Sequence, residues 1–132
     1  MTKIILSIFF SLIINLSFAQ TQADLNQEAQ KKYKKTEAEI NYVYQQILKE
    51  YSSDVVFIKN LRTAQRLWIQ FRDAEMKAKF PKKSAGYYGS VQPSCWSAYL
   101  TELTEERIAK LKIWLTGIEE GDVCAGSVKI KS

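Results

Sequence analysis

The pattern of apolar positions divides most of the chain into three helical segments. Residues 22–52, 54–80 and 94–115 each carry apolar side chains at spacings of three and four. Polar residues separate the first two segments, and Pro81 ends the second. No stretch alternates with the two-residue period of a strand. The sequence therefore predicts an all-α fold, a three-helix bundle with long first and second helices and one irregular loop before the third.

In each segment the apolar stripe defines the face that is expected to point into a shared core. The expected core residues are Leu25, Ala29, Tyr33, Ile40, Tyr44, Ile47 and Tyr51 in the first segment, Val55, Ile58, Leu61, Ala64, Trp68, Phe71, Ala74 and Ala78 in the second, and Trp96, Leu103, Leu111 and Leu115 in the third, together with Tyr99 or Leu100 and with Arg107 or Ile108. Gly117 or Gly121 is expected to end the third helix.

The run from Ala64 to Glu75 is the most informative stretch, because a polar stripe lies beside its apolar one. A face that mixes Trp, Gln, Arg and Glu either buries a hydrogen-bonded network between helices or presents a recognition surface. Arg72 and Arg107 both lie on core-facing stripes, and a buried guanidinium needs a carboxylate or several carbonyls. Glu75 is the local candidate for Arg72. We interpret the set as a structural network, with an anchor for an acidic partner group as the alternative: Gln65, Trp68, Arg72, Glu75 and Arg107.

The N-terminal residues 1–19 have the features of a signal peptide. Lys3 precedes an almost wholly apolar run, and small residues stand at Ser17 and Ala19, the two positions that a signal peptidase reads. The apolar run is short for a transmembrane span, although an uncleaved anchor is the alternative. We expect cleavage after Ala19, export to the periplasm or the medium, and no stable membrane insertion afterwards.

The composition excludes most catalytic and metal chemistry. The chain has 132 residues and no histidine, so the commonest general base and metal ligand are missing. Paired carboxylates suffice for glycoside hydrolysis, and Glu102, Glu105 and Glu106 could make such a pair with Asp73 or Glu75. Such a pair needs a shaped cleft, which nothing in the spacing indicates. We therefore predict a protein that is not an enzyme and that has no metal and no cofactor.

Two surface features are candidates for binding. The predicted loop 81–93 carries Lys82, Lys83 and the pair Tyr87-Tyr88 between glycines, a composition frequent at binding surfaces. The alternative is a helix connection whose tyrosines fold back onto the core. A basic run, Lys31-Lys32-Tyr33-Lys34-Lys35, lies in the first segment and is explained most simply as a solvated helix face. The net charge is +5, or +4 once Lys3 is removed.

The two cysteines, Cys95 and Cys124, leave two possibilities open. An exported chain with an even number of cysteines often forms a disulfide. However, these two lie at opposite ends of the predicted third helix, roughly 30 Å apart by helical rise. A bridge requires the tail to run back along the helix, or the helix to start late or break.

Taken together, these stretches resemble the LprI-type lysozyme-inhibitor family of small exported bacterial proteins. The resemblance covers roughly residues 24–115, and its most specific part is the run Ala64-Gln65-Arg66-Leu67-Trp68-Ile69-Gln70-Phe71-Arg72-Asp73-Ala74-Glu75. The weaker signs are Asp24-Leu25-Asn26, Ala38-Glu39-Ile40-Asn41-Tyr42-Val43-Tyr44, Gly89-Ser90 and Leu103-Thr104-Glu105-Glu106-Arg107. Glu28, Met76 and Tyr99 stand where many relatives carry cysteine, so no disulfide pattern is carried over.

The resemblance implies an α-helical, exported domain. Combined with the N-terminal pattern and the polar, Gly-containing end of the chain, it leads us to expect a signal peptide at residues 1–19, an LprI-like helical domain at 20–118 and a flexible tail at 119–132. It implies a non-enzymatic protein that binds a partner in the cell envelope, such as a lysozyme whose cleft it occludes. The expected contacts are Tyr87, Tyr88, Glu102, Glu105 and Glu106. The rival is a structural or stress-related envelope module that binds anionic polymer or lipid through its lysines. No nucleic-acid partner is expected, and the oligomeric state is left open.

Overall fold

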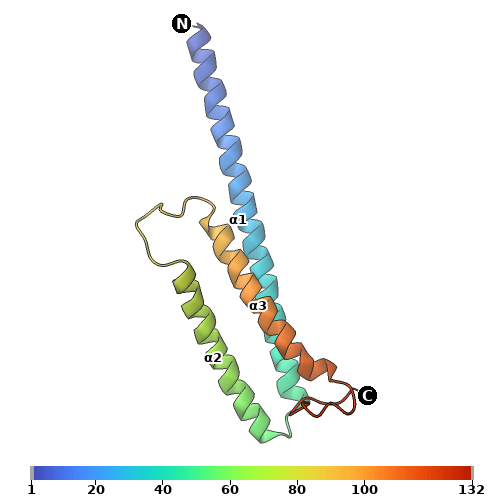
Figure 1. The fold of residues 1–132 in the computed structure, drawn as a ribbon. Helices are drawn as coiled ribbons and strands as arrows, with labels where there is room; N and C mark the ends of the chain where they lie inside the picture. Colours follow the sequence, from blue (N-terminus) through green and yellow to red (C-terminus); the bar gives the residue numbers. More distant parts are fainter. Residues whose placement is uncertain (1, 132) are drawn as a thin grey trace.

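The computed structural model describes the backbone of residues 2–131 and the side chains of residues 21–131. Three helices follow one another along the chain: α1 (Thr2–Glu50), α2 (Val55–Lys79) and α3 (Gln92–Thr116) (Figure 1). An irregular loop, residues 80–91, joins α2 to α3 at one end of the bundle. The short α1–α2 turn and the C-terminal tail lie at the other end. This arrangement confirms the predicted all-α three-helix bundle.

The apolar pattern placed the start of the first helix at residue 22. In the structure α1 begins far upstream of that residue. The expected signal peptide, residues 1–19, lies outside the residues whose side chains are described, so its cleavage remains a prediction. Over the part of the chain that the structure describes, no helix is long and apolar enough to cross a membrane.

Local chemistry explains where α2 and α3 begin and end. Asp54 caps α2, because its carboxylate oxygen Oδ1 accepts the Phe57 backbone N–H at 2.9 Å. Phe80 is the C-cap of α2, and Pro81 follows it directly and prevents the helix from continuing. The third helix starts at Gln92, two residues before the predicted start, because Pro93 fits the first turn, where its missing N–H costs no hydrogen bond.

The closest helix pair is α1 and α3, and small polar residues of α3 make this contact possible. Ser97, Thr101 and Thr104 are buried on the face toward α1, with Thr104 fully buried. The Thr101 and Thr104 hydroxyls donate to backbone carbonyls one turn earlier in α3, at 2.8 and 2.6 Å. Their polar groups are therefore satisfied inside the helix, and their small size lets α1 approach closely.

One hydrophobic cluster joins all three helices. Its buried members are Ile40, Val43 and Ile47 of α1, Phe57 and Leu61 of α2, and Ile108 and Leu111 of α3. The predicted core face was correct for Ile40, Ile47, Leu61 and Leu111. It was wrong for Leu25, which is 51% exposed near the start of the described side chains.

The buried face of α2 differs from the predicted apolar stripe. Phe71 is 55% and Val55 74% exposed, whereas Gln65 and Met76 are buried. The inward face runs along Phe57, Leu61, Gln65, Trp68, Arg72 and Met76, and so coincides with most of the polar stripe. This face buries large side chains at both ends of α2, whereas the predicted stripe ends in alanines and buries less apolar area.

The tail after α3 forms a closed loop rather than a free end. Ile118 and Ile130 make an isolated parallel bridge, and backbone hydrogen bonds of 3.0 and 2.8 Å join the two segments of the tail there. The Tyr51 hydroxyl donates to the Trp114 carbonyl and accepts the Lys129 N–H, which ties the tail to α1 and α3. Flexibility of residues 119–132 remains a prediction, but these contacts define the path of the tail.

Gly117 makes that loop possible. It ends α3 with φ of +76°, a conformation that glycine adopts without strain. A Cβ atom at this position would lie 2.9 Å from the Lys129 carbonyl oxygen. The glycine is therefore required both by its backbone conformation and by the close approach of the tail.

Candidate functional site

The polar stripe of α2 lies along the seam between α2 and α3. Arg107 of α3 donates from Nε to Oε1 of Gln65 at 3.1 Å, and the Tyr99 hydroxyl donates to Oε1 of Glu75 at 2.9 Å. Both hydrogen bonds join α2 to α3, and the backbones of these two helices lie close together at few positions. The structure thus brings Gln65, Glu75 and Arg107 to one seam, and the role of this seam in setting helix register remains our proposal.

Arg72 does not pair with Glu75, the partner that its spacing suggested. Its Nε and Nη2 atoms both donate to Oδ1 of the neighbouring Asp73, at 3.0 and 2.8 Å. Its guanidinium also lies 5.3 Å from the centre of the Trp68 ring, within range of a cation–π contact. Glu75 is engaged by Tyr99 instead, and this hydrogen bond is the main cause that raises the pKa of Tyr99 above its ordinary value.

Tyr87 and Tyr88, the two tyrosines of the loop 80–91, differ in their surroundings. Tyr88 folds back: its ring meets Phe80 edge-on at 6.0 Å between centroids, and its hydroxyl donates to the Pro81 carbonyl at 2.7 Å. Tyr87 points away from the core and is 63% exposed. Tyr88 therefore follows the alternative in which the tyrosines fold back onto the core, whereas Tyr87 is exposed and its role in binding remains a prediction.

The base of this loop is ordered by aromatic packing. Phe80 contacts the rings of Trp96 and Tyr99 on α3, with centroids 5.6 and 6.4 Å apart. Tyr87 itself packs edge-on against Tyr88 at 5.0 Å, and the Lys83 ammonium lies 5.6 Å from the Tyr87 ring. An exposed aromatic ring on a packed base loses little conformational freedom when it binds, which suits a contact residue.

The three glutamates expected to contact a partner do not form one patch with this loop. Glu102, Glu105 and Glu106 are exposed on α3, and Glu102 lies ten positions beyond the first residue of that helix, about 15 Å along it. Glu105 faces α1, where it lies 3.5 Å from the Lys32 ammonium. Glu106 faces α2 and lines a shallow hollow with Trp68 and Phe71.

Two of the carboxylates considered for acid–base catalysis accept hydrogen bonds from neighbouring side chains. Asp73 accepts hydrogen bonds from Arg72, and Glu75 accepts one from Tyr99. Within the described residues, no group of three His, Cys, Asp or Glu side chains is placed to hold a metal ion.

The two cysteines are free and exposed. Cys95 lies in the first turn of α3, and Cys124 lies in the tail beyond its last turn. Because the tail closes on itself through Ile118 and Ile130, it does not run back along the helix. The structure thus shows Cys95 and Cys124 unpaired, and a bridge between them remains an untested prediction.

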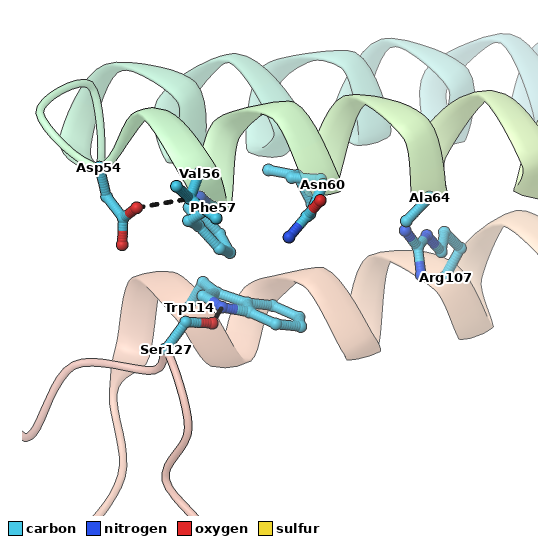
Figure 2. Close-up of a pocket in the computed structure, with 9 residues that line it drawn as sticks. Asp54, Val56, Phe57, Asn60, Ala64, Arg107, Trp114 and Ser127 are labelled. Atoms are coloured by element: carbon cyan, nitrogen blue, oxygen red, sulfur yellow. Dashed lines mark hydrogen bonds between the residues drawn. The ribbon is translucent and has the colours of Figure 1, made fainter.

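Sequence reasoning missed the residues that form a pocket between α2 and α3. Phe57 and Trp114 line it together with Arg107 (Figure 2). A signal was present, because Trp114 lies seven positions after Arg107 and thus on the same face of α3. Phe57 was passed over because the neighbouring Val55 and Ile58 fitted the predicted stripe.

The fold and the candidate site together define a class, an all-α three-helix protein with an exposed tyrosine on the loop between α2 and α3. The family model described as Lysozyme inhibitor LprI matches residues 15–111, and the chain belongs to this family. It is also 34% identical over 106 residues to an uncharacterized protein of Rhizobium meliloti (strain 1021), across 71% of this chain and 73% of that protein. No solved structure matches significantly. The resemblance drawn from the sequence is thus confirmed.

Proposed function

We propose that this protein is exported and inhibits a lysozyme by occluding its cleft with the loop 80–91, without catalysing a reaction itself. Membership of the lysozyme inhibitor LprI family supports the activity. The observation that carries the proposed mode of binding is the exposed Tyr87, held on the packed base formed by Phe80 and Tyr88.

The charge of the loop matches the chemistry of a glycosidase cleft. Such clefts hold a pair of carboxyl groups, one of them ionised. The loop carries Lys82 and Lys83 and has no acidic residue. Insertion of the loop would place cations near those carboxylates and the Tyr87 ring where a sugar ring binds. The site is thus electrostatically complementary even though the whole chain is positively charged.

The net charge of +4 that remains once Lys3 is removed opposes encounter with a basic partner, so exposed acidic side chains on α3 are needed to offset the repulsion. Glu102 and Glu106 lie one turn apart on α3 and are exposed, and neither is in an ion pair within the described residues. We assign them to peripheral contacts with the basic outer surface of a lysozyme. Glu105, which is close to Lys32, contributes less.

An assay of cell-wall lysis tests the proposal. The chain without residues 1–19, added in large excess, is expected to slow lysis by lysozyme. Tyr87→Ala is expected to weaken inhibition by about 30-fold, the loss of roughly 2 kcal/mol that defines a binding hot spot. Tyr42→Ala is the matched control, because Tyr42 is 64% exposed but lies on α1. Undiminished lysis with the unaltered protein would refute the proposal, and equal losses in both variants would refute the role of the loop.

The second candidate is an envelope module that binds anionic polymer or lipid. It is favoured by the run of exposed lysines on α1, in which Lys31, Lys34 and Lys35 make no ion pair within the described residues. This function predicts retention on vesicles of anionic lipid that falls steeply as salt rises, because exposed charges are screened. Retention that does not change with salt would count against it.

A further inference from the structure

A pocket of about 400 Å³ opens between the N-terminal half of α2 and the C-terminal half of α3. Its walls are mainly apolar, with Phe57 and Leu61 from α2 and Trp114 from α3. Figure 2 shows the Phe57 and Asn60 side chains directed from α2 toward Trp114, and Arg107 beside Ala64. Its volume and lining are typical of a site for a small molecule, which combines apolar walls with a few polar groups.

Among the described residues, no anionic side chain pairs with the guanidinium of Arg107. The Arg107 side chain is half-buried, and burial lowers the pKa of its guanidinium below the ordinary value. Its one side-chain hydrogen bond goes to Gln65, a neutral amide, and it takes part in no ion pair within the described residues. A guanidinium has five N–H donors, and a desolvated one is normally paired with an anion. An anionic ligand would supply the missing partner.

The charges of the pocket also set a direction for such a ligand. Asp54 lies at the opposite end from Ala64 and Arg107, ten positions along α2 and thus about 15 Å away. Its carboxylate already accepts the Phe57 N–H. An anionic group is attracted to the Arg107 end and repelled from the Asp54 end, while the apolar walls lie between the two.

We infer that this pocket binds a small amphipathic carboxylate, which pairs with Arg107 and packs its apolar body against Trp114 and Phe57. The site is independent of the loop 80–91, which lies at the other end of the bundle (Figure 1). A ligand here would therefore bind without competing for the surface proposed to contact a lysozyme.

Calorimetric titration with octanoate, below the concentration at which it forms micelles, tests this inference on the protein purified after export. Octanoate is expected to bind at one site, and neutral octanol is expected to bind at least about tenfold more weakly, because it cannot form a charge-assisted hydrogen bond. The absence of octanoate binding, or equal binding of octanol, would overturn the inference.

Two variants locate the site. Arg107→Gln is expected to weaken octanoate binding by about tenfold to a hundredfold, the range for loss of a hydrogen bond to a charged group. Lys110→Gln is the control, because Lys110 lies nearby on α3 but lines the neighbouring hollow rather than this pocket. Equal weakening in both variants would show attraction to general positive charge and would overturn the site.

A third variant decides the matter if Arg107→Gln fails to fold. Ala64 is exposed on α2 and lines the pocket, so Ala64→Leu preserves the helix while it fills the space. Binding of octanoate is expected to be lost in this variant, with helical content unchanged by circular dichroism. Binding that persists unchanged in Ala64→Leu would overturn the placement of the ligand.

Discussion

Replacing Leu111 with alanine is expected to lower the free energy of unfolding by about 2–5 kcal/mol. Leu111 is fully buried on the face of α3 that meets α1, within the cluster formed with Ile40, Val43 and Ile47. Truncation removes apolar contacts with α1 and leaves a cavity that the rigid helix pair fills only in part. Urea unfolding followed by circular dichroism measures the loss as a lower midpoint with an unchanged slope.

Ile113→Ala is the control for this prediction, because Ile113 is on the same helix but is 39% exposed. Its expected cost is about 0.5–1 kcal/mol, since little apolar area leaves the core. If both variants lost the same stability, the α1–α3 contact would not be the main source of stability in the fold.

Replacing Trp68 with alanine is expected to cost about 3 kcal/mol, the low end of the range for buried tryptophans. The ring is half-buried, packs against the hydrophobic cluster and lies beneath the Arg72 guanidinium. Its loss would open the seam where Arg107 meets Gln65, so α2 would lose both apolar and polar contacts with α3. The measurement is again the midpoint of urea unfolding.

Leu67→Ala serves as the comparison, because Leu67 precedes Trp68 in α2 and is 55% exposed. A small loss is expected there, within about 0.5 kcal/mol. A Trp68→Ala variant that stays fully stable but no longer inhibits lysozyme would reassign this stripe from a structural network to a recognition surface.

The sequence did not determine how α2 is rotated about its own axis, and thus which of its faces points toward the core. Its two candidate faces share Trp68, and their centres differ by less than a quarter turn of the helix, so periodicity alone does not separate them. The neighbouring helix decides between them: α3 offers Arg107 to Gln65 and Tyr99 to Glu75, and polar groups can be buried only where such partners exist. Phe71 therefore faces solvent, although it is a large apolar residue.

The candidate site was predictable in its location but not in its detail. Gly86, Gly89 and the tyrosines between them marked the loop before α3 as a surface feature. That Tyr88 would fold onto Phe80 and leave Tyr87 exposed depends on the position of Trp96 and Tyr99 on α3, which supply the rest of the aromatic base. The pocket at Arg107 was not predictable, because its walls come from two helices whose relative rotation was unknown.

The sequence by itself determined the number and order of the helices, the position of the loop and the family, because these follow from local periodicity, from Pro and Gly, and from one specific run of residues. Only the tertiary structure showed which face of α2 is buried, that Arg107 has no anionic partner among the described residues, and that Cys95 and Cys124 are unpaired in the structure. The physical reason is that each of these depends on contacts between residues distant in the chain. Such contacts are set by which helix lies opposite and what side chains it offers, and no local pattern contains that information.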